Sequence, residues 1–294
     1  MNKKLLLIAC CILCCLQGLW AQNEPELTEE QIMAILSDSI HGQKGIVNHP
    51  NHHFDIQVPE GYVYLDHEKA TRLLVDYWGN PEDEDILGVL VSDTVNIYVN
   101  AEIAYLIYYM DSGYVSDKDA KDIDYDDLLA ELKKEAKQSS DNLSEEYAKY
   151  ELVDWALEPR YDTDKKILVW AKHLRFGGEQ EILNYDIRIL GKQGVVVMQA
   201  VASMDDCDKV VADEGLIASS ARFTSGYTYA DFNPATDRIA EWTIGGLIAG
   251  KVMAKAGLFA KLGILLAKFW KIIAVAIFAI GAPLFKKFKK DKEG

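Results

Sequence analysis

The chain has 294 residues, 26% of them charged, and its formal net charge is −15 at pH 7. Residues 22–250 carry 44 acidic and 19 basic residues, whereas residues 251–294 carry ten lysines and two acidic residues. A middle region with a net charge of −25 excludes a basic nucleic-acid-binding face as the main function, so we expect no nucleic-acid partner.

The first 21 residues have the pattern of a secretory signal peptide. Lys3 and Lys4 precede an apolar run of 12 residues, 5–16, which is too short to span a bilayer core of about 30 Å. Ala21 offers a small residue at the cleavage point, so the mature chain is predicted to begin at Gln22. A lipoprotein signal ending at Cys10 is the alternative, but only five apolar residues would precede that cysteine.

Four of the five cysteines lie in the predicted signal, so the mature chain keeps only Cys207. An intramolecular disulfide is therefore excluded after cleavage. Asp205, Asp206 and Asp208 surround this cysteine, and acidic neighbours raise the pKa of a thiol and make it less reactive. We expect a structural thiol.

Residues 22–243 are predicted to form an acidic extracytoplasmic α+β domain. Hydrophobic spacing and turn signals predict helices over 28–40, 68–78, 117–137 and 205–218, and strands over 54–58, 87–91, 95–99, 150–157, 166–176, 182–190 and 194–202. Residues 103–110 fit a strand or a short helix. The short turn at 191–194 favours an antiparallel meander. The predicted fold class is α+β, an antiparallel β-meander with flanking helices plus a C-terminal transmembrane helix.

Residues 262–285 are predicted to be that transmembrane helix. Only Lys268 and Lys271 are charged in this stretch, and its 24 residues would extend about 36 Å as a helix. The basic tail, residues 286–294, follows directly and is expected in the cytoplasm. We therefore predict a single-pass protein of the cytoplasmic (inner) membrane, with the lipid bilayer as a partner and the main domain on the periplasmic side.

Residues 244–261 are predicted to be a membrane-proximal amphipathic segment. A two-span hairpin over 244–260 and 269–285 is the alternative, but it would place the basic tail outside, against the charge rule. Gly246, Gly250 and Ala254 form a small-xxx-small stripe in this segment, a pattern that can bring helices together. Small residues are also common in such segments, so helix association with a membrane or envelope protein stays a hypothesis.

Two clusters of metal-binding residue types occur in the domain. His41, His49, His52 and His53 could suit zinc or copper, but no C-x-x-C or H-E-x-x-H motif accompanies them, and an exposed polar loop is expected. Asp122, Asp124 and Asp126 begin like a calcium loop, but Asp127 replaces the required glycine and Lys133 the required glutamate. Helix capping by acidic residues is the preferred interpretation, so we expect no metal or cofactor.

Aromatic and charged residues of the meander strands are the candidate binding residues: Trp155, Tyr161, Trp170, Lys172, Tyr185 and Arg188. Alternate residues of a strand share a face, so Trp170 and Lys172 face one way, while Tyr185 faces away from Asp186 and Arg188. Such a face can bind a peptide or a sugar. Cross-strand pairs that fix the strand register are the alternative.

Motifs for nucleophilic catalysis are absent from the sequence, including G-x-S-x-G and S-x-x-K. We therefore expect no enzyme but a membrane-anchored envelope protein whose domain binds a ligand or partner. The alternative is an envelope hydrolase built from the scattered carboxylates Asp117, Asp162 and Asp186. That alternative requires convergent carboxylates of unequal pKa in one pocket.

Six short motifs together resemble a known family: Trp78–Pro81, Gly113–Ala120, Pro159–Asp162, Trp170–Lys172, Leu183–Gly191 and Tyr229–Pro234. They resemble the bacterial membrane-anchored proteins grouped as DUF2167, from about Ile40 into the C-terminal anchor. The resemblance implies a membrane-anchored protein without an established activity. It supplies no functional residues.

Overall fold

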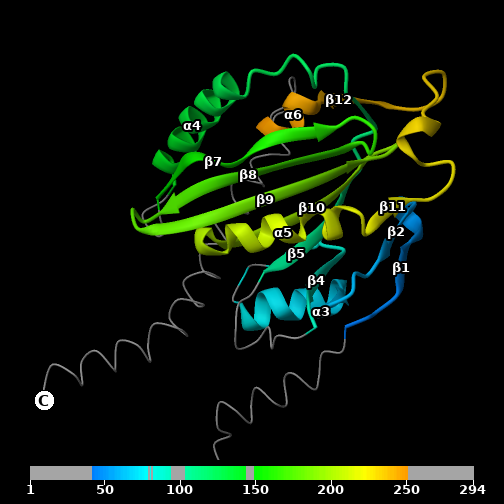
Figure 1. Cartoon of the computed structure of the whole chain (residues 1–294), viewed down its shortest axis with the longest axis horizontal. Coiled ribbons are helices and arrows are strands. Elements are labelled where there is room, and N and C mark those ends of the chain that lie inside the picture. Colours follow the sequence, from blue (N-terminus) through cyan, green and yellow to red (C-terminus); the bar gives the residue numbers. More distant parts are fainter. Residues whose placement is uncertain (1–41, 79, 81, 94–102, 144–148, 251–294) are drawn as a thin grey trace, which may run out of the picture. The chain divides into compact units, whose positions relative to one another are not determined.

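The computed structural model describes residues 42–78, 80, 82–93, 103–143 and 149–250 (Figure 1). They form a mixed α+β fold around a seven-stranded antiparallel sheet, which confirms the α+β part of the prediction. The predicted signal peptide, the helix over 28–40, the strand over 95–99 and the transmembrane helix over 262–285 lie outside the described residues. Within the described ranges, none of the helices has the length and apolar character needed to cross a membrane.

The central sheet runs in the order β3 (Tyr62–Asp66), β4 (Gly88–Ser92), β5 (Ala104–Met110), β10 (Val195–Ser203), β9 (Gln180–Leu190), β8 (Ile167–Phe176) and β7 (Tyr150–Asp162). The four strands β7 to β10 form the predicted meander, because each pairs antiparallel with the next. Residues 103–110, which fitted either a strand or a short helix, contain β5. This strand pairs with both β4 and β10 and thereby joins the two halves of the sheet.

Strand β7 is longer than predicted and irregular. It extends to Asp162, and its pairing register with β8 shifts at three places. Each shift marks a bulge or irregularity that bends the strand and interrupts its pattern of alternation. Pro159 lies within the strand as well. The alternating pattern that we used to predict strand length therefore ended too early, at residue 157.

Two smaller sheets contain strands that are distant in the sequence. In the first, β2 (Phe54–Gln57) lies between β1 (Ile46–His49) and β11 (Ala221–Phe223). In the second, β6 (Tyr114–Ser116) pairs in parallel with β12 (Ile239–Thr243). The sequence pattern predicted only β2 of these five strands, because short strands are stabilised by partners far away in the chain rather than by local periodicity.

The helices begin and end close to the predicted positions, with one correction. Helix α3 (His67–Thr71) continues as the π-helical turn η2 (Arg72–Tyr77), and α5 (Cys207–Ala218) follows the 3₁₀ turn η3 (Met204–Asp206). Helix α4 (Tyr125–Asp141) begins eight residues later than the predicted start at Asp117. Asp124 caps it by accepting hydrogen bonds from the backbone N–H groups of Asp126 and Asp127.

The two faces of the central sheet are covered differently. On one face α5 and the strands β1, β2 and β11 contribute to one continuous hydrophobic cluster. On the other face the apolar side chains fall into three clusters, which contain residues of α3, of α4 and of α6 (Ile244–Ala249) respectively. Figure 1 shows α4 beside β7 and α5 along β10. We call this second face, with its three separate clusters, the interrupted face. Several buried polar side chains of the central sheet lie on it.

The predicted membrane-proximal segment, 244–261, is described only as far as Gly250. Helix α6 includes Gly246 and ends at Ala249, and Gly250 caps it with a φ of 68°. The left-handed conformation suits glycine because it has no Cβ. Ala254 lies outside the described residues, so association through the small-residue stripe stays a prediction.

Candidate functional site

Six polar or aromatic side chains lie together on the interrupted face of the central sheet, and we call them the polar patch: Trp170, Lys172, Asn184, Asp186, Arg188 and Gln199. Strand register brings them together. Asp186 of β9 is opposite Trp170 of β8 on one side and Gln199 of β10 on the other, and Asn184 is opposite Lys172. Because residues two apart share a face, Asn184 and Arg188 flank Asp186 along the same strand.

A buried ion pair forms the centre of the polar patch. Nη2 of Arg188 lies 2.8 Å from Oδ1 of Asp186, and the exposed fractions of the two residues are 4% and 2%. Gln199 donates a hydrogen bond of 3.2 Å to the same carboxylate oxygen. The Arg188 guanidinium also lies 5.3 Å from the centre of the Trp170 ring, within cation–π range.

Four hydrogen-bond donors in the polar patch are buried and have no partner among the residues that the structure describes. They are Nε1 of Trp170, Nδ2 of Asn184, and Nε and Nη1 of Arg188. A buried polar group without a partner costs about 1–3 kcal/mol, so most native structures satisfy such groups with protein, water or a ligand. Additional hydrogen-bond acceptors would therefore stabilise the polar patch.

Lys172 is the least buried member of the polar patch. The residue is partly exposed, whereas the other five residues are at least nine-tenths buried. Burial lowers the pKa of Lys172, and the charge of Arg188 lowers it further, while Asp186 and Glu135 of α4 raise it.

The structure separates the six predicted binding residues. Trp155, Tyr161, Trp170, Lys172 and Arg188 share the interrupted face, but Trp155 donates to the backbone oxygen of Tyr125 and Tyr161 binds Asp117. Tyr185 lies on the opposite face, as its alternation with Asp186 and Arg188 predicted, and donates to Glu214 of α5. Only Trp170, Lys172 and Arg188 of the predicted set belong to the polar patch.

Two members of the polar patch were missed by the sequence reasoning. Asn184 lies in a strand of otherwise mostly apolar residues, and Gln199 interrupts the apolar run of β10. Polar residues within buried strands were the available signal. Their register against Lys172 and Asp186 was the missing information, since it depends on pairing between strands.

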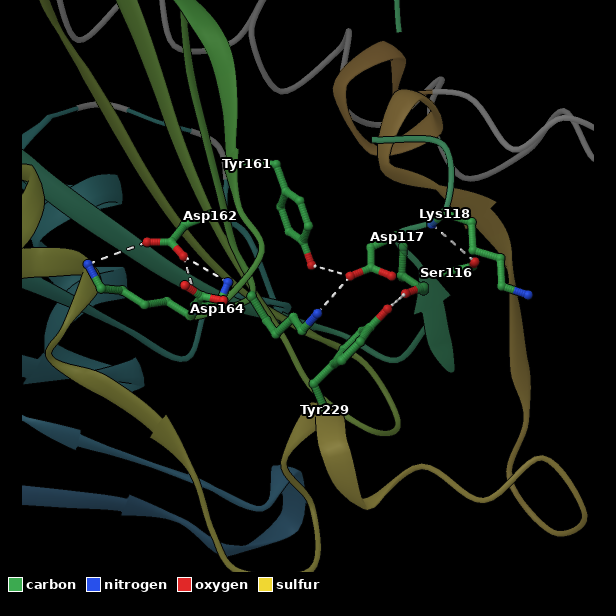
Figure 2. Close-up of polar contacts among 10 residues, drawn as sticks. Ser116, Asp117, Lys118, Tyr161, Asp162, Asp164 and Tyr229 are labelled. Carbon is green, nitrogen blue, oxygen red and sulfur yellow. Dashed lines mark hydrogen bonds and ion pairs between the residues drawn. The ribbon is translucent and has the colours of Figure 1, made fainter. Parts of the chain in front are cut away.

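A second cluster lies at the turn between β7 and β8 (Figure 2). Oδ2 of Asp117 accepts hydrogen bonds from Nζ of Lys166 at 2.8 Å and from the hydroxyl of Tyr161 at 3.0 Å. Nζ of Lys166 also lies 4.8 Å from the ring centre of Tyr229, whose hydroxyl donates to the backbone oxygen of Val115. The cluster ties β6 and the 3₁₀ turn η4 (Tyr229–Asp231) to the meander.

The carboxylates of the hydrolase alternative have separate partners. Burial raises the pKa of Asp117, but its hydrogen bonds with Lys166 and Tyr161 outweigh burial and make the net shift downward. Asp162 caps the turn by accepting from the N–H groups of Lys165 and Asp164, which lowers its pKa (Figure 2). Asp186 pairs with Arg188. Asp117 and Asp162 therefore lack the raised pKa that a general acid requires.

The histidines pack against aromatic rings. The His49 ring stacks on Phe54 with centroids 4.6 Å apart, and the His53 ring stacks on Tyr227 at 3.5 Å. The expectation of a polar loop was wrong for His49, which ends β1. His41 lies outside the described residues, and among the residues that the structure describes no group of three or more His, Cys, Asp or Glu side chains could hold a metal ion.

We expect the protein to lose stability as the pH falls from about 6.5 to about 4, partly because of His49. Burial, followed by the nearby charge of His52, lowers the pKa of His49 from 6.5 to about 4, although Asp55 opposes the shift. A histidine whose pKa is depressed in the folded state stabilises fully above its unfolded pKa, and this contribution disappears as pH falls through its folded pKa. Because the group is only half-buried and solvent screens its charge, we expect His49 to account for a loss of about 1–2 kcal/mol in the free energy of unfolding.

The measurement is urea unfolding at a series of pH values for the wild type and for His49→Phe. Phenylalanine keeps the stacking on Phe54 and removes the titrating group. The variant should therefore lose less stability between pH 6.5 and 4 than the wild type. If the free energy of unfolding changed equally with pH in the two proteins, His49 would not contribute to the pH dependence.

The thiol of Cys207 fits the predicted structural role. Cys207 is the first residue of α5 and is partly buried. Burial raises its pKa, and the charge of Asp208 raises it further. Both effects disfavour the reactive thiolate at neutral pH.

Two solved structures resemble the fold of this chain at low sequence identity. A solution structure of cyanobacterial PsbP (CyanoP) from Synechocystis sp. PCC 6803 is 12% identical, with 63% of this chain and 95% of that chain covered and a TM-score of 0.37. A crystal structure of LpqN, involved in cell envelope biogenesis of Mycobacterium tuberculosis, is 15% identical, with coverages of 65% and 96% and a TM-score of 0.29. At these scores the likeness carries no functional argument.

No curated protein matches the chain. The family described as "Protein of unknown function (DUF2167)" matches residues 41–279, which is most of the chain and agrees with the resemblance of the motifs. The chain therefore belongs to the DUF2167 family.

Proposed function

We propose that this protein is a membrane-anchored component of the bacterial cell envelope whose acidic α+β domain binds a small ligand outside the cytoplasmic membrane. One observation carries the binding part of the proposal: four buried donors of the polar patch have no acceptor within the described part of the chain. A ligand that supplied acceptors would remove the cost of leaving them unpaired. Lys172 is the least buried residue of the polar patch.

The membrane part of the proposal rests on the sequence. A signal-like N-terminus, an apolar stretch over 262–285 and a basic tail together favour one membrane span with the acidic domain outside. The acidic charge of residues 22–250 fits a domain held away from anionic lipid surfaces, while the C-terminal lysines suit the anionic cytoplasmic leaflet.

Cysteine labelling tests this topology. In a Cys207→Ser background, Lys165→Cys places a thiol at a position whose side chain is 73% exposed, and Lys292→Cys places one in the basic tail. A membrane-impermeant maleimide should label the first variant once the outer membrane is permeabilised. It should label the second only after the cytoplasmic membrane is broken.

Other labelling patterns would contradict the proposed topology in different ways. Labelling of both variants before the cytoplasmic membrane is broken would support the two-span hairpin. Protection of Lys165→Cys until lysis would place the acidic domain in the cytoplasm. The Cys207→Ser protein without a new cysteine is the control for background labelling.

Native mass spectrometry of the full chain, gently purified from its own membranes, tests ligand binding. We expect an additional small-molecule mass that disappears on denaturation and is reduced in a Trp170→Phe variant, which lacks one of the donors. A Trp155→Phe variant is the matched control, because the Trp155 indole already donates to the Tyr125 backbone. A chain that carries no additional mass would contradict binding of a small ligand.

A further inference from the structure

We infer that the ligand of the polar patch presents an oxyanion, a carboxylate or phosphate group, to Trp170, Asn184, Arg188 and Lys172. This inference rests on the proposed binding function and adds the chemical class of the ligand. It is carried by three properties of the polar patch: the identity of its unpaired atoms, its charge and its dimensions.

The unpaired atoms of the polar patch are all donors. The indole nitrogen of Trp170, the amide nitrogen of Asn184 and two guanidinium nitrogens of Arg188 each carry hydrogen and are buried without a partner in the described ranges. The Asp186 carboxylate, by contrast, already accepts from Arg188 and Gln199. A ligand rich in acceptors completes the polar patch, whereas a cation or a ligand composed of donors would leave these groups unpaired.

The charge of the polar patch favours an anionic acceptor over a neutral one. Among the six residues of the polar patch, the two basic side chains of Arg188 and Lys172 accompany one carboxylate, Asp186, and Glu135 of α4 acts on Lys172 from outside the patch. Hydrogen bonds from an ionised donor to an oxyanion are shorter and roughly twice as strong as those between neutral groups. Burial strengthens them further, because the interior screens charges less than water does.

Carboxylates near the edges of the polar patch limit the size of the anion. Glu135 of α4 contributes to the electrostatic field at Lys172. Asp83 accepts a hydrogen bond of 3.2 Å from the hydroxyl of Tyr108. Tyr108 is in turn close enough to Arg188 for the guanidinium charge to lower the pKa of its hydroxyl, although burial raises that pKa overall. A polyanion extending beyond the donors would meet these carboxylates, so a single compact anionic group fits best.

The strand register gives the scale of the polar patch. Side chains directly opposite on neighbouring strands are about 5 Å apart, and residues two apart along a strand are about 7 Å apart. Asn184 and Trp170 are therefore each a near neighbour of Asp186, and Arg188 is within cation–π range of Trp170. These spacings bring the donors close enough together for one compact acceptor group to be shared among them.

The Trp170 indole provides a direct probe of the inference. The chain contains six tryptophans, so an ¹⁵N-labelled full chain in detergent micelles gives few indole N–H resonances, and the Trp170→Phe variant identifies the one from Trp170. Sodium acetate, inorganic phosphate and a short-chain anionic phospholipid are titrated separately at matched ionic strength. Sodium chloride and glycerol serve as the non-oxyanion and neutral probes.

We expect the Trp170 resonance to shift saturably with at least one oxyanion and not with chloride or glycerol. The Lys172→Gln variant should bind that oxyanion at least about tenfold more weakly, because it loses a charge-assisted contact. Lys165→Gln, a change at an exposed lysine outside the polar patch, should leave the affinity unchanged. The oxyanion that binds distinguishes a carboxylate, free phosphate or a lipid headgroup.

Three outcomes would overturn the inference. A saturable shift with glycerol alone would mean that the ligand is neutral, and the proposed binding function would stand without the oxyanion. The absence of a shift with every probe would indicate donors satisfied by water. Equal affinity in wild type and Lys172→Gln would place the anion elsewhere. None of these outcomes alters the native mass-spectrometry or topology results, so the proposed function is judged separately.

Discussion

Arg188→Met is expected to lower the free energy of unfolding by about 3–5 kcal/mol. The side chains of Arg188 and Asp186 are 5% and 3% exposed, and they form a direct ion pair. Removing the guanidinium leaves the Asp186 carboxylate buried and hydrogen-bonded to the Gln199 amide but without its ion pair, and an uncompensated buried charge is strongly destabilising. Urea unfolding followed by tryptophan fluorescence measures the loss.

The double variant Asp186→Leu/Arg188→Met separates the cost of an orphaned charge from the value of the ion pair. Apolar replacement of both partners is often neutral or stabilising, so the double variant should recover most of the lost stability. Lys165→Met, which breaks an exposed ion pair with Asp162, is the matched control and should change stability little. A double variant as unstable as Arg188→Met would contradict the explanation by orphaned charge.

Phe54→Ala is expected to lower the free energy of unfolding by a similar amount, about 3–5 kcal/mol. The Phe54 side chain is completely buried and belongs to the hydrophobic cluster that joins β1, β2 and β11 to the central sheet. Its ring lies 6.2 Å from the Tyr109 ring on β5 and 6.3 Å from the Phe223 ring on β11. Truncation would create a cavity between the two sheets and remove these aromatic contacts.

Urea unfolding of Phe54→Ala tests this role, and Ile46→Ala on β1 is the control. Ile46 is 63% exposed, so its truncation should have little effect. Because His49 stacks on Phe54, the Phe54 variant should also return the pKa of His49 toward 6.5 by exposing its ring. A loss of less than about 1 kcal/mol would show that Phe54 does not hold the small sheet on the central one.

The elements that could be predicted were those with a strong local signal. The strands of the meander have long apolar or alternating runs separated by short turns, and α5 and the region of α3 have helical spacing. The start of α4 was predicted too early, because the acidic residues before Asp124 resemble a helix N-terminus in composition. Only the cap geometry shows that Asp124 accepts from the first free backbone N–H groups.

Elements that depend on distant partners could not be predicted. Strand β11 pairs with β2 across more than half of the described chain, and β12 pairs with β6. Short strands of three to five residues carry too little periodicity to stand out in the sequence. Their stability comes from pairing and burial, which local patterns do not encode.

The sequence by itself determined the separation of charge along the chain, the alternation of side chains on the meander strands and the motifs of the DUF2167 family. It placed Trp170 and Lys172 on one face because side-chain alternation is a local property of a strand. Only the tertiary structure decided that Asn184, Asp186, Arg188 and Gln199 join them and that four donors stay buried without acceptors from any described residue. Strand register and burial arise from contacts between distant segments, so the polar patch becomes visible only after folding.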